Sequence, residues 1–240
     1  MPSKRFIIFG EGRCGSTALV SRLGSIEGVQ CDNEVLAFKV PFPHQHVMMG
    51  ASKSKCDVYG CKVLAFHIRD LQPIRDRDGF VKQLHENEFK IIHLRRKNLV
   101  HHALSNIRAN KFGYHQQKAK KLKKTGKVHV DLEELMGWMT RTEGLYAYED
   151  KLLEGVPSLT LTYEDHIASE DKQRMMMPLV CDFIGIPYEE GNCAYKKISP
   201  RSLRDSIENY EEIETALAGT KYEVFLDERE PTESVAKAEC

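Results

Sequence analysis

Eight residues near the start of the chain, Gly10 to Thr17, have the glycine spacing of a phosphate-binding loop. They read Gly-Glu-Gly-Arg-Cys-Gly-Ser-Thr and follow a short apolar run, Phe6–Phe9. The segment matches the pattern G-x-x-x-x-G-K-[ST], except that Ser16 stands where a lysine is expected. Glycines allow successive backbone N–H groups to converge on phosphate oxygens at a helix start, where the helix dipole also favours an anion. The loop therefore predicts an anion-binding site.

The missing lysine changes the chemistry that this loop predicts. In nucleoside triphosphatases that lysine reaches the β- and γ-phosphates, so its absence disfavours such an enzyme. Arg13 instead places a guanidinium inside the loop, which can bind an oxyanion through two donors.

A second group of cations follows another apolar run. Arg95, Arg96 and Lys97 come directly after Ile91–Leu94, and Ser105 lies about two turns into the helical pattern that follows. Positive charge at a helix N-terminus opposes the helix dipole, which indicates an anion that compensates for it. Two anion sites on one sheet predict a ligand with phosphates at both ends.

The elements that must position these groups alternate between strands and helices. Strands are expected at Phe6–Phe9, Val58–Ala65, Phe89–Leu94 and Ser158–Tyr163, and helices at Ser16–Leu23, Asn98–Ala109, Asp131–Leu153, Asp171–Ile184 and Ser206–Ala218. This alternation predicts an α/β fold, a P-loop-like open parallel sheet flanked by helices. Ligands of such sheets bind beyond the carboxyl ends of the strands.

Composition limits the classes of protein that fit. The 240 residues include 35 basic and 35 acidic side chains, which argues against a nucleic-acid partner. They contain neither a run of about 18 to 20 apolar residues nor the apolar core of a signal peptide, so we expect no membrane span. Seven scattered cysteines favour free thiols, and hence the cytoplasm. We expect one domain over residues 1–226 and a polar, frayed tail over 227–240.

The two motifs together resemble the sulfotransferase family, which takes sulfuryl groups from 3′-phosphoadenosine 5′-phosphosulfate. The likeness rests on G-R-C-G-S-T-A-L in the first motif and H-L-R-R-K-N-L-V-H-H-A-L-S in the second. It continues in Leu161–Asp165 and Phe183–Pro187, which are similar to the family segments Y-E-D-L and F-L-G-I-P. The chain is most similar to bacterial sulfotransferases of the trehalose-sulfotransferase-like type, including Ile198–Pro200 and Asn209–Tyr210.

The resemblance implies roles for particular residues. The 5′-phosphosulfate would be held by Arg13, Cys14, Gly15, Ser16 and Thr17, and the 3′-phosphate by Ser105 with an arginine of the second motif. The usual family spacing places a basic residue eight before the serine, which here is Lys97; among the three cations Arg96 is preferred, then Arg95.

The chemistry of sulfuryl transfer assigns two further tasks. Charge develops on the transferring group and the leaving oxygen, and Arg13 with the loop amides can stabilise it without a metal ion. The acceptor, a hydroxyl of a carbohydrate or small metabolite, must lose its proton. Glu34, a short connection after the first helix, matches the glutamate base of the similar carbohydrate enzymes; His101 and His102 are alternative bases, although helix-surface positions are expected for them.

Two other functions remain open at this point. A P-loop kinase of a small molecule would need Mg²⁺ and a cation in place of the absent lysine, and a non-catalytic module would only bind adenosine phosphates. The lysine-rich run over Lys118–Lys127 is expected to be a solvated face or a surface that attracts an acidic glycan. Met175–Met177 are expected in the core or in an acceptor wall.

Overall fold

A five-stranded parallel sheet forms the centre of the computed structural model, which describes residues 2–113, 126–194 and 202–226. Its strands lie in the order β2-β3-β1-β4-β5 and every neighbouring pair is parallel. They span Lys4–Gly10 (β1), Val29–Asp32 (β2), Val58–Leu64 (β3), Phe89–Arg95 (β4) and Ser158–Thr162 (β5). The predicted α/β fold with an open, P-loop-like parallel sheet is confirmed.

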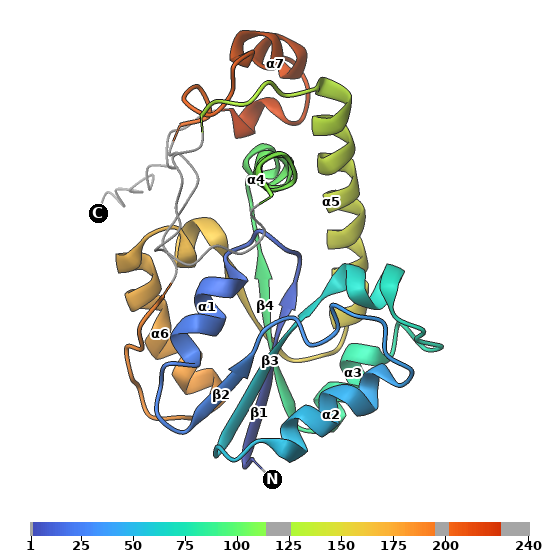
Figure 1. The fold of residues 1–240 in the computed structure, drawn as a ribbon, viewed down its shortest axis with the longest axis vertical. Coiled ribbons are helices and arrows are strands. Elements are labelled where there is room, and N and C mark those ends of the chain that lie inside the picture. Colours follow the sequence, from blue (N-terminus) through green and yellow to red (C-terminus); the bar gives the residue numbers. More distant parts are fainter. Residues whose placement is uncertain (1, 114–125, 195–201, 227–240) are drawn as a thin grey trace, which may run out of the picture.

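Helices cover both faces of the sheet (Figure 1). One face carries α1 (Ser16–Leu23) and α6 (Glu170–Ile184), and the other carries α2 (Pro43–Lys53), α3 (Phe80–Glu86) and the end of α5 (Leu132–Leu153). Short π-helical turns, η1 (His67–Leu71) and η3 (Tyr163–Ile167), begin near the carboxyl ends of β3 and β5. The central strands are therefore covered on both sides, which is why they read as continuous apolar runs.

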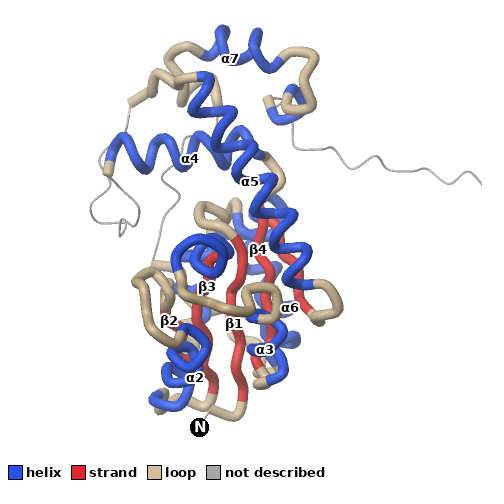
Figure 2. Tube along the Cα trace, turned by 90° about the vertical axis from the view of Figure 1, so that its right-hand side faces the viewer, coloured by secondary structure: helices blue, strands red, loops and turns tan. Residues whose placement is uncertain are grey.

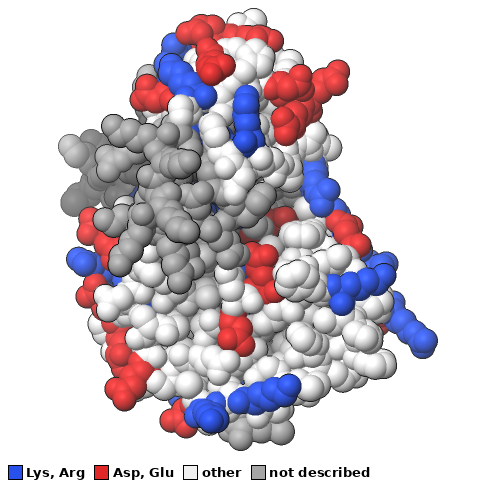
Figure 3. Space-filling model, in the orientation of Figure 1, with Lys and Arg blue, Asp and Glu red and all other residues white. Residues whose placement is uncertain are grey.

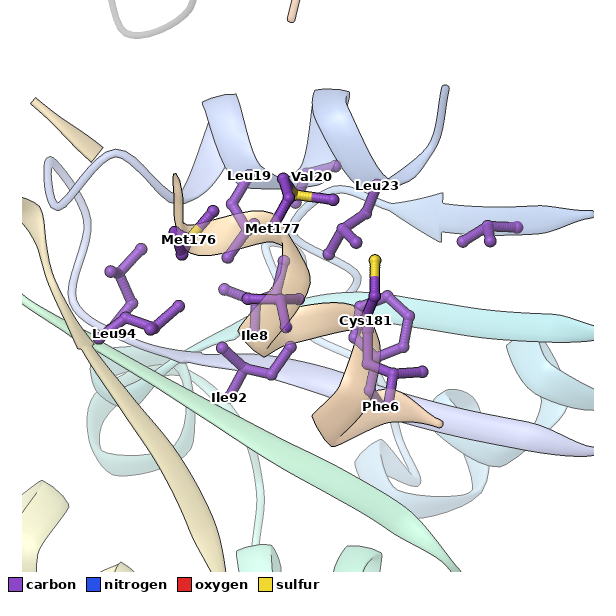
Figure 4. Close-up of a cluster of buried hydrophobic side chains, with 14 of the residues drawn as sticks. Phe6, Ile8, Leu19, Val20, Leu23, Ile92, Leu94, Met176, Met177 and Cys181 are labelled. Carbon is purple, nitrogen blue, oxygen red and sulfur yellow. The ribbon is translucent and has the colours of Figure 1, made fainter. Parts of the chain in front are cut away.

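The core on the α1 face shows how the sequence builds this packing (Figure 4). Phe6 and Ile8 of β1 meet Leu19 of α1 and Met177 of α6. Met176 and Met177 are buried in this core, whereas Met175 is 80% exposed. The alternate residues of β1, Ile7 and Phe9, belong to the core on the other face of the sheet.

A further layer lies beyond the carboxyl ends of the strands (Figure 2). It contains α4 (Leu99–Phe112), the first half of α5, α7 (Tyr210–Leu217) and a 3₁₀ turn, η4 (Glu223–Phe225). These elements share a third hydrophobic cluster. Because α4 crosses the end of the sheet, it faces the loop that follows β1.

Most predicted elements are present within a few residues of their expected ends, including Asp131 as the N-cap of α5 and Gly185 at the end of α6. No expected element corresponds to β2, α2 or α3, which span only 4, 11 and 7 residues. The last helix begins at Tyr210, later than its expected start at Ser206. Ser206 and Glu208 exchange backbone hydrogen bonds with Val128, and this bridge keeps them outside α7.

Several expectations concern segments outside the described residues: Lys118–Lys124 of the basic run, Ile198–Pro200 and the tail over 227–240. Among the described helices, none is both long and apolar enough to cross a membrane. No two of the six described cysteines form a disulfide with each other.

Gly10 is the position where backbone packing constrains the loop most severely. Its φ is 144°, and a Cβ there would lie 2.2 Å from the carbonyl oxygen of Leu94 on β4. We therefore expect Gly10→Ala to lower the free energy of unfolding by at least about 2–3 kcal/mol, because the neighbouring backbone must move. Urea denaturation measures this change.

Gly137 on α5 provides the matched control, because a Cβ there has nothing within 4 Å. Gly137→Ala should raise the free energy of unfolding by about 0.5–1 kcal/mol through helix propensity. If Gly10→Ala proves as stable as the native protein, the close approach of β1 and β4 at the loop is not rigid.

Candidate anion-binding site

The segment between β1 and α1 folds as a tight loop with two left-handed residues. Arg13 has φ 64° and Gly15 has φ 82°. A Cβ on Gly15 would lie 2.3 Å from Cγ2 of Ile167, so η3 packs closely against the loop at that point. Left-handed backbone flanking Cys14 turns successive peptide groups and creates a concave surface suited to anions.

Two side chains outside the loop fix the direction of its peptide groups. His102 of α4 donates from Nε2 to the carbonyl of Gly12 at 2.7 Å, and Nη1 of Arg96 donates to the carbonyl of Arg13 at 3.4 Å. In a trans peptide the N–H points opposite to the carbonyl. The N–H groups of Arg13 and Cys14 therefore point away from His102 and Arg96.

The start of α1 adds further donors. Gly15 is its N-cap residue and has no side chain to cap the helix, while Ser16 is buried and Thr17 half-buried. The first N–H groups of a helix have no intrahelical acceptor, and the dipole makes this end attractive to anions. The loop and helix start thus provide a set of backbone donors.

Cys14 contributes to this site through its backbone. Its side chain is fully buried in the core, with Sγ 3.5 Å from the carbonyl oxygen of Gly12 and 3.9 Å from the hydroxyl of Tyr146. Burial raises the pKa of the Cys14 thiol far above its usual range. A buried thiol that stays neutral is a poor nucleophile.

The structure joins the two predicted anion-binding motifs. Nε of Arg13 donates to Oγ of Ser105 at 3.1 Å, across 92 residues of sequence. Ser105 is on the buried side of α4, 7% exposed, and faces the loop. Arg13, Arg96 and Ser105 therefore converge at the carboxyl end of β1.

The three consecutive cations of the second motif have different surroundings. The guanidinium of Arg96 lies 4.4 Å above the ring of Tyr163 and 3.6 Å from Oε1 of Glu164, and it reaches the loop. Arg95 instead binds α5, where Glu149 and Asp150 accept from it. Of the three, only Arg96 is thus observed in contact with the loop.

Lys97 is paired with Asp165, and its backbone N–H donates to Glu164 at 2.8 Å. Glu164 also accepts from the N–H of Asn98 at 3.1 Å, at the start of α4. Two carboxylates of the chain itself thus compensate for positive charge at this helix start. Glu164 is also close to Arg96, so the donors that these carboxylates leave for an external anion are the backbone N–H groups of the loop and of the start of α1.

A cavity of about 570 Å³ opens on the α5 side of the second motif. Its lining combines both signs of charge: Arg95, Arg96, Lys97, Leu99, Glu143, Tyr146, Ala147, Asp150 and Thr162. Tyr146 connects this cavity to the loop. Its hydroxyl accepts from the N–H of Arg96 at 3.0 Å and donates to the carbonyl of Arg96 at 2.9 Å, which holds that residue in place.

The predicted base, Glu34, follows β2 rather than the first helix directly. It lies just beyond the end of that edge strand and forms an ion pair with Nζ of Lys62 at 2.9 Å. Lys62 is only 2% exposed, on β3. His67 is close enough to both for their charges to act on it, while burial lowers its pKa to about 4. Glu34, Lys62 and His67 thus form one polar group at the carboxyl edge of the sheet.

Lys62 and His67 were not among the site residues expected from the sequence. Lys62 interrupts an otherwise apolar strand, and this signal alone could have marked it. The expectation of a helix-surface position is wrong for His102, which is 2% exposed. Burial lowers the pKa of His102 to about 4, so its neutral ring supports the loop.

A second buried carboxyl group lies inside the loop itself. Glu11 is 9% exposed and accepts from the N–H of Phe66 at 3.3 Å. Burial, followed by the negative charge of Glu149, raises the pKa of Glu11 to about 8. Glu149 is fully buried on α5 and accepts from His93 at 2.9 Å and from Arg95 at 3.2 Å. Glu11 is therefore protonated at neutral pH, which keeps its negative charge out of the loop.

Charged residues of both signs are interspersed on the surface seen in Figure 3. Within residues 2–113, 126–194 and 202–226, no three side chains from His, Cys, Asp and Glu are grouped to hold a metal ion.

No protein-family model matches the chain, and no curated protein matches it significantly.

The protonation of Glu11 gives a pH dependence with a defined sign. The folded state keeps this proton up to about pH 8, whereas the unfolded chain releases it near the ordinary glutamate pKa of 4.5. Between these values the folded state binds more protons, so the stability contributed by Glu11 falls as pH rises, by up to about 1.4 kcal/mol per pH unit. Urea denaturation at several pH values should show Glu11→Gln gaining stability relative to the native protein from pH 5 to pH 8. Parallel stability curves for the two proteins would show that Glu11 ionises normally.

Proposed function

We propose that this protein is a sulfotransferase that moves a sulfuryl group from 3′-phosphoadenosine 5′-phosphosulfate to a hydroxyl group. The observation that carries the proposal is the 3.1 Å hydrogen bond between Arg13 of the loop and Ser105 of α4. It brings a lysine-free phosphate-binding loop against a second oxyanion-binding position. Such a pair suits a nucleotide with anionic groups at its 5′ and 3′ ends.

The loop fits the 5′ end of this donor. Its backbone donors and the start of α1 suit a phosphosulfate, and Arg13 adds a guanidinium for the oxygens of the sulfuryl group. Arg96 and Ser105 fit the 3′-phosphate, because a guanidinium and a hydroxyl are both good donors to phosphate. Arg95 forms ion pairs with Glu149 and Asp150 of α5, so we assign it to holding the second motif in place and not to binding the nucleotide.

One contact in the structure argues against the kinase alternative. A kinase loop without its lysine needs another cation at the β- and γ-phosphates. Lys62 lies on the strand beside β1, but its ammonium is bound by Glu34 at 2.9 Å. This ion pair makes Lys62 a poor replacement.

Transfer requires one bond to form as another breaks. The acceptor oxygen bonds to sulfur while the bond from sulfur to the 5′-phosphate oxygen breaks, and adenosine 3′,5′-bisphosphate leaves. Negative charge on the leaving oxygen is stabilised by Arg13 and the loop amides. The acceptor proton passes to the carboxylate of Glu34, whose orientation is fixed by Lys62.

Thermal denaturation with nucleotides tests the nucleotide assignment. Adenosine 3′,5′-bisphosphate at about 100 times its Kd should raise the Tm by about 5–10 °C in the presence of a chelator, because two protein sites bind its phosphates. AMP at the same concentration should raise the Tm much less. A larger shift with ATP and Mg²⁺ would favour the kinase, and a bisphosphate shift without any sulfuryl transfer would favour a binding module.

Removal of Glu34 tests the proposed base, but the single variant leaves Lys62 buried without its counter-charge. An unpaired buried charge costs stability, so Glu34→Gln is combined with Lys62→Gln. Turnover of the double variant should fall about 10²–10⁴-fold, because its amide cannot accept the proton. Mass spectrometry of the sulfated product measures this loss.

Lys62→Gln alone is the control, because it retains the carboxylate. Its turnover should fall much less than that of the double variant, because the introduced amide can still donate to the carboxylate, and both variants should bind adenosine 3′,5′-bisphosphate as the native protein does. Normal turnover of the double variant would remove Glu34 from the mechanism and leave His67 as the next group to examine.

A further inference from the structure

The carboxylate of Glu164 lies at the start of α4 in the way that a bound anion would. Its Oε2 accepts from the N–H of Lys97 at 2.8 Å, and its Oε1 accepts from the N–H of Asn98 at 3.1 Å. Oε1 is also 3.6 Å from Nε of Arg96. Backbone donors at a helix start, joined by a guanidinium, are the groups that bind phosphate in proteins. Glu164 therefore uses donors that suit an external phosphate.

The guanidinium of Arg96 is buried, yet its hydrogen bonding is incomplete. Arg96 is 7% exposed; its Nη1 donates to the carbonyl of Arg13 at 3.4 Å, and the ring of Tyr163 lies 4.4 Å from its central carbon. Nε is buried and has no hydrogen-bond acceptor among the residues that the structure describes, because 3.6 Å to Glu164 is too long for one. A buried N–H without an acceptor is costly. Arg96 thus keeps a donor for a better-placed oxyanion.

The backbone that carries Glu164 is fixed, but its carboxylate is not enclosed. Nζ of Lys172 donates to the carbonyl of Glu164 at 2.9 Å, and the N–H of Ala168 donates to the carbonyl of Tyr163 at 2.8 Å. The side chain of Glu164 is 29% exposed. Rotation about its own side-chain bonds therefore moves the carboxylate away from Arg96 without any movement of η3 or of the loop.

We propose that Glu164 is an internal competitor of the 3′-phosphate for Arg96. A phosphate that reaches Nε must displace the carboxylate or lie beside it, and like charges so close together repel each other. This inference rests on the proposed function, in which Arg96 binds the 3′-phosphate. Its consequence is weaker binding of the product nucleotide, which favours product release, a step that limits turnover in many enzymes.

A purely structural role for Glu164 predicts the opposite effect. If the carboxylate only anchors η3 to the start of α4, its removal loosens Arg96 and the adjoining loop, and nucleotide binding weakens. If the carboxylate competes with the 3′-phosphate, its removal tightens binding. The sign of the change in affinity therefore separates the two roles.

Isothermal titration of adenosine 3′,5′-bisphosphate and AMP measures this sign in the native protein and in Glu164→Gln, which loses the charge and keeps the size. The variant should bind the bisphosphate at least about tenfold more tightly, because a neighbouring negative charge is gone. Its affinity for AMP should stay close to the native value, since AMP has no 3′-phosphate. Glu164→Ser, too short to reach Arg96, should also tighten the bisphosphate, and thermal denaturation without ligand checks that both variants are folded.

Asp165→Asn is the matched control. It removes the same charge from the adjacent residue, whose carboxylate pairs with Lys97 instead of Arg96. The affinity of this variant for the bisphosphate should change much less than that of Glu164→Gln. A gain of equal size would show that any negative charge near α4 has this effect, and would overturn a specific competition at Arg96.

Failure of the inference and failure of the proposed function give different results. Sulfuryl transfer by the native protein, with bisphosphate affinity unchanged or weakened in Glu164→Gln, would reject the competition and keep the function. Tighter bisphosphate binding by Glu164→Gln, with no sulfuryl transfer by the native protein, would keep the competition and reject the function. Absence of bisphosphate binding in both proteins would overturn both.

Discussion

The orientation of two peptide groups in the loop after β1 is the constraint on which the candidate site depends. The carbonyls of Gly12 and Arg13 would otherwise be free to turn toward an anion and repel it. His102 and Arg96 bind these carbonyls from the second motif, at 2.7 and 3.4 Å. The N–H groups are directed to the opposite side as a result, so the protein has organised its donors before any ligand arrives.

This arrangement requires α4 to lie across the end of the sheet, and α5 holds it there. Tyr146 of α5 binds both the N–H and the carbonyl of Arg96. Glu149 on the next turn anchors Arg95 and His93 at the end of β4. Tyr146, His93 and Glu149 each have a hydrogen-bond partner on another segment, which reduces the cost of burying them. The loop, β4 and α5 thus form one connected polar network beneath the site.

The fold and the two anion motifs were predictable because they rest on local signals. Apolar runs mark β1, β3 and β4, and the glycine spacing with Arg13 marks the loop. Partners contributed by distant segments carry no such signal. Nothing in the sequence around Tyr146 indicates that its hydroxyl binds the backbone of Arg96. The role of Lys62 in β3 is visible only in the fold, where Glu34, just after β2, forms an ion pair with it. Glu164, which compensates for charge at the start of α4, also comes from a distant segment and was not expected there.

In the proposed complex, the loop binds the 5′ end of the nucleotide while Ser105 and Arg96 bind the 3′-phosphate. Isothermal titration of adenosine 3′,5′-bisphosphate and AMP, with the native protein and with Ser105→Ala, tests it most directly. Loss of one hydrogen bond to a charged phosphate should weaken the bisphosphate by about 10–100-fold and leave the affinity for AMP unchanged. Equal weakening of both ligands, or of neither, would show that Ser105 does not bind the 3′-phosphate.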